Sequence, residues 1–94
     1  MKLVSAAIKF YIKDDTYPTI MCGKRHYNVL EKMYNLHIEY DKQAAVQGFL
    51  TDNDTFVDRY EAFEIACAAG QLLPEAKEEY KDKIITQLFS EDVW

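Results

Sequence analysis

The spacing of apolar residues near the start of the chain predicts a pair of strands. Residues 3–13 are almost continuously apolar and β-compatible, and residues 19–22 form a second, shorter β-favouring run. Asp14 and Asp15 between these runs are typical of a turn. Together the two runs predict an antiparallel hairpin that ends at Gly23.

From residue 24 onward, apolar residues recur every three or four positions, as they do in an amphipathic helix. The stripe that predicts this first helix consists of Tyr27, Leu30, Met33 and Tyr34, followed by His37 or Ile38. The pattern is ambiguous between Asn35 and Ala45, because only residues 38–40 alternate. The first helix is therefore predicted to end near Leu36.

The middle of the chain predicts a second hairpin that leads directly into a second helix. Residues 46–51 and 55–57 are β-favouring runs on either side of a short polar turn. Asp58 and Glu61 then form the capping box of a helix that Gly70 can end. The small-residue face of that helix, suited to packing on a sheet, consists of Ala62, Ile65, Ala66 and Ala69.

The last part of the chain completes the predicted fold class. After Pro74, residues 75–88 predict a third helix, whose apolar stripe consists of Tyr80, Ile84, Ile85 and Leu88. The fold class is α+β: a small antiparallel β-sheet of two hairpins packed against two main helices, plus a C-terminal helical segment. We expect a single domain over residues 1–94. A domain of this size buries only about 60% of its unfolded surface, so we also expect a homo-oligomer, from dimer to hexamer.

Composition limits the kinds of partner. The net charge of -5 disfavours polymeric nucleic acid, which needs a broad basic surface. Every apolar run is shorter than the ~18 residues of a membrane span, so no membrane partner is expected. Cys22 and Cys67 are the only cysteines, and no signal peptide precedes them. We therefore expect reduced thiols and a cytoplasmic location.

Both main helices are predicted to open with an arginine in the first turn, Arg25 after Gly23 and Arg59 after Asp58. A cation at the positive end of the helix dipole is unfavourable unless an anion shares the exposed backbone N–H groups. This pattern predicts a small anionic ligand. Asp58 already supplies an anion to the second helix, so Arg25 and His26 have the stronger claim to bind it.

Each candidate also has a purely structural interpretation. Arg25 can be a solvated surface charge, and His26 can pack against the sheet edge. Arg59, which we group with Gln47 and Phe49 of the preceding hairpin, can instead form an ion pair. Phe49 fits a core position better than a surface on which a ligand base stacks. Both interpretations stay open for these five residues.

No pattern in the sequence specifies catalysis or a metal. Cys22 precedes His26 by four residues near basic neighbours, but no third group orients the pair, and a buried cysteine at a strand end is commoner. The same spacing suits zinc, yet His37 and Cys67 would have to complete the site from distant segments. A calcium loop counted from Asp52 lacks the glycine and the glutamate that it requires. We therefore expect no enzyme, no cofactor and no bound metal.

The sequence resembles a family of small proteins carried by bacteriophages and prophages. The resemblance rests on short blocks in this order: Ala6-Ala7-Ile8-Lys9, Arg25-His26, Gln47-Gly48-Phe49, Phe56-Val57-Asp58-Arg59, Glu61-Ala62, Ile65-Ala66, Ala69-Gly70-Gln71 and Leu88-Phe89-Ser90-Glu91-Asp92. These blocks cover nearly the whole chain. Within that group the sequence is similar to the Thoeris anti-defence sponge proteins of the first type, which sequester immune signalling nucleotides without cleaving them.

The resemblance implies a ligand and a way of binding it. The expected ligands are cyclic di- or trinucleotides and cyclic ADP-ribose isomers, bound in pockets between subunits in the host bacterial cytoplasm. Their phosphates would contact Arg25, His26 and Arg59 from neighbouring subunits. Phe49 or Tyr60 would cover a base. No bond is broken in this mechanism, which is capture in a fixed stoichiometry.

The C-terminal part departs from the sponge family. That family's ADP-ribose pocket draws on aromatic and arginine residues there, whereas this chain has no arginine after Arg59. A reduced pocket would consist of Phe89, Asp92 and Trp94; without it, cyclic oligonucleotides at the arginines are the expected ligands. Three alternatives stay open: a protein–protein interaction module that inhibits a host factor, a phage assembly protein, and an enzyme that degrades the nucleotide.

Overall fold

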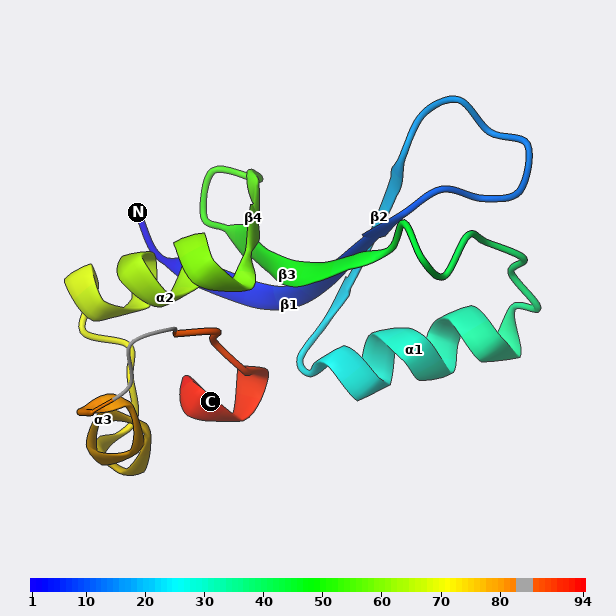
Figure 1. Cartoon of the computed structure of the whole chain (residues 1–94). Coiled ribbons are helices and arrows are strands. Elements are labelled where there is room, and N and C mark those ends of the chain that lie inside the picture. The colour runs from blue at the N-terminus through cyan, green and yellow to red at the C-terminus, as the bar shows by residue number, and fades with distance from the viewer. Residues whose placement is uncertain (83–85) are drawn as a thin grey trace.

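A four-stranded antiparallel sheet with strand order β2-β1-β3-β4 forms the centre of the computed structural model, which describes residues 1–82 and 86–94 (Figure 1). The strands are β1 (Leu3–Phe10), β2 (Thr19–Gly23), β3 (Val46–Thr51) and β4 (Phe56–Asp58). Both predicted hairpins are therefore confirmed. β1 ends at Phe10, earlier than predicted, and Ile12 continues only as an isolated bridge to Tyr40.

The helices follow the predicted order, but the last one is shorter than predicted. They are α1 (His26–Asn35), α2 (Arg59–Ala68), α3 (Pro74–Tyr80) and a short 3-10 turn, η1 (Ser90–Asp92). Residues 86–89 are not helical, because the Leu88 N–H donates to the Arg59 carbonyl at 3.1 Å and ties this segment to the start of α2. Ile84 and Ile85, two residues of the predicted stripe, lie outside the described residues.

The predicted signals at both ends of α2 are confirmed. The Asp58 carboxylate accepts hydrogen bonds from the N–H groups of Tyr60 and Glu61 at 3.0 and 2.9 Å. At the other end, Gly70 has φ +69° and donates its N–H to Cys67, while the next residue donates to Ala66. This is the Schellman arrangement, in which a left-handed residue after the helix satisfies its last carbonyls.

The core lies on one face of the sheet, where both long helices pack. Successive side chains of a strand point to opposite faces, so Ala6, Ile8 and Phe10 share this face. The cluster beneath α2 includes Ala62 and Ala66, both fully buried, whereas Ile65 is half-buried and Ala69 is exposed, so only part of the predicted small-residue face packs on the sheet. A second cluster lies beneath α1. Figure 1 shows the two helices along different halves of the sheet.

The buried stripe of α1 differs from the predicted one. His26, Val29 and Met33 are buried, whereas Tyr27 and Tyr34 are 64% and 81% exposed. The apolar pattern leaves the histidine out, but it donates a hydrogen bond to β3 and so turns its own side of the helix toward the sheet. An apolar flank of α1 is left in solvent as a result.

On the opposite face, the Phe56 ring lies over Gly48, and the Lys9 ammonium lies 5.9 Å above the ring centroid. Only glycine allows this approach, because a Cβ at Gly48 would overlap the carbonyl oxygen of Val57.

Among the helices of residues 1–82 and 86–94, we find none with the length and apolar character that crossing a bilayer requires.

Candidate functional site

The N-termini of α1 and α2 converge on the middle of β3. His26, the first residue of α1, donates from Nε2 to the Gly48 carbonyl at 2.7 Å. Arg59, the first residue of α2, donates from Nη2 to the side-chain oxygen of Gln47. Because Gln47 and Gly48 are neighbours, one chain brings together side chains that were predicted to meet between neighbouring subunits.

The C-terminal turn closes over this junction (Figure 1). Trp94 donates from its indole Nε1 to the Lys24 carbonyl, just before α1. The Phe89 ring lies against Arg59, with the guanidinium carbon 4.6 Å from the ring centroid. Asp92 holds the turn together by accepting from the Tyr80 hydroxyl at 2.7 Å and from the Phe89 N–H at 2.9 Å. Asp92 and Trp94 are thus engaged in contacts within the chain.

His26 and Phe49 occupy core positions, which favours their structural interpretation over a role as ligand contacts. Burial lowers the pKa of His26, the Gly48 hydrogen bond opposes that shift, and the charge of Arg59 adds to it. His26 meets the ring of Phe49 edge to face, with centroids 5.1 Å apart. Phe49 is fully buried, and the Trp94 ring also packs against it, with centroids 6.0 Å apart. A neutral, hydrogen-bonded histidine and a covered ring offer no free surface to a nucleotide.

The two arginines retain unfilled hydrogen-bond donors. Nη1 of Arg25 and Nε of Arg59 are buried, and among the described residues neither has a hydrogen-bond partner. Burial lowers the pKa of Arg59, while the charge of Glu91 opposes that shift. A buried donor left without a partner is unfavourable by about 1–3 kcal/mol, and by more when it is charged. Such groups call for an explanation, of which a bound anion is one.

The two helix N-termini differ in capping, as predicted. Asp58 occupies the first N–H groups of α2. At α1 the capping position belongs to Arg25, whose side chain makes no capping hydrogen bond; its own N–H donates to the Asn28 side chain at 3.1 Å. The start of α1 therefore keeps its dipole uncompensated by an acidic cap.

A pocket of about 390 Å³ opens beside Arg59. Its lining consists of Ala45, Val46, Gln47, Asp58, Arg59, Tyr60 and Gln87. Tyr60 is 49% exposed and its hydroxyl accepts from the Gln87 amide at 2.6 Å. Three predicted residues, Gln47, Arg59 and Tyr60, thus line one pocket. Gln87 was missed, because the pattern placed it on the surface of the predicted third helix.

The remaining candidates do not line this pocket. Phe89 packs against Arg59, and Arg25 stands at the start of α1 beside His26. Arg59 and His26 are close enough for the arginine charge to influence the histidine pKa. Two guanidinium groups and the uncapped start of α1 make this a positive junction, although the Glu91 carboxylate also acts on Arg59 and His26.

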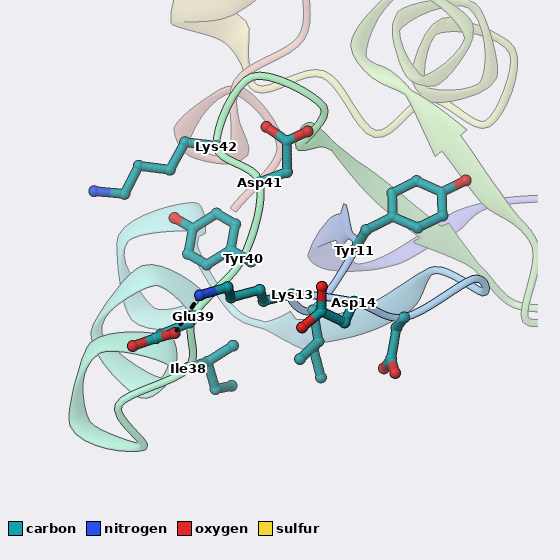
Figure 2. Close-up of a pocket in the computed structure, with 10 residues that line it drawn as sticks. Tyr11, Lys13, Asp14, Ile38, Glu39, Tyr40, Asp41 and Lys42 are labelled. Atoms are coloured by element: carbon teal, nitrogen blue, oxygen red, sulfur yellow. Dashed lines mark ion pairs between the residues drawn. The ribbon is translucent and has the colours of Figure 1, made fainter.

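A larger pocket of about 790 Å³ lies away from the arginines, at the far end of the sheet (Figure 2). It lies between residues 11–15, which follow β1, and residues 38–42, which follow α1. Its lining carries four carboxylates and two lysines, and Lys13 and Glu39 form an exposed ion pair of 4.0 Å. An excess of carboxylates repels phosphate, so this pocket does not fit an anionic ligand.

The thiols and possible metal ligands lie apart from one another. Within residues 1–82 and 86–94, no group of three histidine, cysteine or acidic side chains is placed to hold a metal ion. Cys22 and Cys67 are free thiols, and both are exposed, so the interpretation of Cys22 as a buried residue at a strand end is wrong. Burial of its sulfur still raises the pKa of Cys67, and the nearby charge of Glu64 adds to this shift.

The chain was compared with known protein families, curated proteins and solved structures. A family model described as Phage T4 y16D protein matches residues 2–94. None of the curated proteins matches the chain. No solved structure matches it either. The resemblance to small phage proteins is therefore confirmed, and the similarity to the sponge branch stays a prediction.

Proposed function

The chain belongs to the Phage T4 y16D protein family, and we propose that it binds and sequesters a small phosphate-bearing nucleotide without cleaving it. The proposal rests on the buried, unpartnered Nη1 of Arg25 and Nε of Arg59. Cyclic di- and trinucleotides are the first candidates, and cyclic ADP-ribose isomers are the second. As a phage protein, it would remove an immune signal of the host by holding it.

The electrostatics of the junction support an anionic ligand. A phosphate can accept from an unfilled guanidinium donor, and hydrogen bonds to charged groups contribute about 1.5–3 kcal/mol each. The uncapped start of α1 adds a further favourable field for negative charge. Tyr60, half-exposed at the pocket, is the aromatic residue available to a base. The Asp58 carboxylate also lines the pocket, so the phosphate should lie at the guanidinium of Arg59, away from Asp58.

Capture fits the junction better than hydrolysis does. Cleavage of a phosphodiester needs a general base or an activated water near the phosphorus. His26 is buried with a lowered pKa, and its Nε2 proton is donated to a backbone carbonyl. Asp58 is occupied with the N–H groups of α2. Burial keeps His26 away from a bound ligand, and its hydrogen bonds hold the Asp58 carboxylate at the start of α2.

Binding is tested by thermal shift and calorimetry with a panel of cyclic di- and trinucleotides and cyclic ADP-ribose isomers. Arg25→Ala and Arg59→Ala should each weaken binding by about 10- to 150-fold, the equivalent of one charged hydrogen bond. Lys13→Ala is the matched control, because it removes an exposed positive charge from the other pocket. The urea midpoint of each variant, measured without ligand, separates lost binding from lost folding.

The outcomes separate capture from its alternatives. Wild-type protein heated after binding should release the nucleotide intact, as chromatography of the supernatant would show; a shortened or linear product identifies an enzyme instead. If no nucleotide of the panel raises the unfolding temperature, or if both folded arginine variants bind like wild type, the proposal is refuted. A protein–protein inhibitor or an assembly protein would give that result.

A further inference from the structure

The apolar side chains of α1 form two neighbouring stripes, and only one of them packs on the sheet. The exposed stripe consists of Tyr27, Leu30 and Tyr34, at 64%, 39% and 81% exposure. Residues at this spacing lie along one flank of a helix. Large apolar side chains gathered on one exposed surface mark an interaction site more often than isolated ones do.

This flank borders a groove of about 520 Å³. The groove is lined by Tyr27, Leu30, Glu31, Met33, Tyr34, Ile38, Tyr40 and Lys42. Met33 is 2% exposed and Ile38 is half-buried, so the groove has an apolar base. Glu31 and Lys42 are the two charged residues of the lining, and both are exposed. The surface is thus an apolar strip flanked by one negatively charged and one positively charged side chain.

We propose that a second copy of this chain docks on the groove, and that the two copies pack through their α1 helices about a two-fold axis. In such an interface each residue faces its symmetry partner's surface, so the patch must complement itself. One negative and one positive side chain satisfy that condition, because Glu31 of each copy can form an ion pair with Lys42 of the other. Two such pairs also offset part of the repulsion between chains that each carry a charge of -5.

The area is sufficient for a reversible dimer. A tyrosine side chain buries about 150–250 Å² when fully covered, so the exposed fractions of the stripe amount to roughly 350 Å² per chain. Complete coverage of these side chains and of the exposed Glu31 and Lys42 would approach about 1,000 Å² for the pair, the lower limit for a specific interface. An interface of that size predicts an equilibrium between monomer and dimer that depends on protein concentration.

The test uses sedimentation velocity and light scattering from about 1 to 500 μM, a range that covers weak association. Wild type should approach twice the chain mass of 11.0 kDa as concentration rises. Tyr34→Glu should remain at 11.0 kDa throughout. The matched control is Asn35→Glu, which adds the same charge one position along α1, on an exposed side chain outside the groove. The control should associate like wild type.

A charge exchange tests the pairing itself. Glu31→Lys and Lys42→Glu should each weaken self-association, by about 2- to 30-fold for the two pairs of a dimer. Mixing these two variants should restore association, because positions 31 and 42 then carry opposite charges across both contacts between the chains; a pair within one chain cannot be restored by mixing. A wild type that stays monomeric, an oligomer that Tyr34→Glu leaves intact, or a mixture that fails to associate overturns the proposal.

Discussion

Gly48→Ala should destabilise the fold more than alanine at either of the other two glycines. The added Cβ would overlap the Val57 carbonyl oxygen and lie 2.7 Å from Cζ of Phe56, where ordinary contact begins at 3.4 Å. The Phe56 ring can rotate away, but the carbonyl belongs to the backbone of β4. β3 and β4 pair through only three positions, so moving that backbone disrupts much of the hairpin.

The magnitude follows from these contacts. Overpacking a fixed site costs about 1–3 kcal/mol and sometimes more, while alanine in place of glycine regains about 0.4–1 kcal/mol by restricting the unfolded chain. We therefore expect a net loss of about 2 kcal/mol, against a total stability of about 5–14 kcal/mol for a chain of this length. Gly70→Ala meets no neighbour but keeps φ +69°, and should cost about 1 kcal/mol.

Gly23→Ala provides the third member of the series. Its Cβ would lie 3.3 Å from a methyl group of Val29, a contact that a side chain can relieve, so the change should stay within about 0.5 kcal/mol. Urea unfolding followed by circular dichroism gives all three values with linear extrapolation. If Gly48→Ala proves no more destabilising than Gly23→Ala, the proposed packing of β4 on β3 is wrong.

The remaining predictions concern His26 and the cap of α2. The pKa of His26 is lowered in the fold from 6.5, so the unfolded chain binds more protons and stability should fall as the pH drops from 6.5 toward the folded pKa. The free energy of unfolding, measured in urea at several pH values, should therefore rise with pH over this range. His26→Gln should flatten this slope, whereas His37→Asn, at an exposed site, should leave it unchanged. Asp58→Ala should destabilise α2 by about 1 kcal/mol and Asp58→Asn by less, since asparagine still caps; equal losses in urea unfolding would contradict the observed capping hydrogen bonds.

Local signals predicted most of the fold because their partners lie close in sequence. The capping box joins residues three positions apart, and the Gly70 turn depends on the backbone of a single residue. The two hairpins likewise pair neighbouring runs. The end of α3 was predicted wrongly for the opposite reason. Residues 86–88 belong to the predicted helical pattern, but Leu88 bonds to Arg59 and Trp94 to Lys24, far away in the sequence.

The candidate site likewise combines features set by local sequence with features set by distant contacts. A histidine in the first turn of a helix can contact a ligand or pack in the core, and its hydrogen-bond partner distinguishes the two roles. The partner of His26 is the Gly48 carbonyl, twenty-two positions away on β3. Phe49 follows His26 into the core because the two rings pack together. The arginines show the opposite case. Their positions at the helix starts were predictable, but the absence of a partner for Arg25 Nη1 and Arg59 Nε among the described residues is a property of the folded chain. The unfilled donors of these two side chains therefore favour an anion at the positive junction. Of the two arginines, Arg25 lies in the stronger positive field, because no acidic residue caps α1.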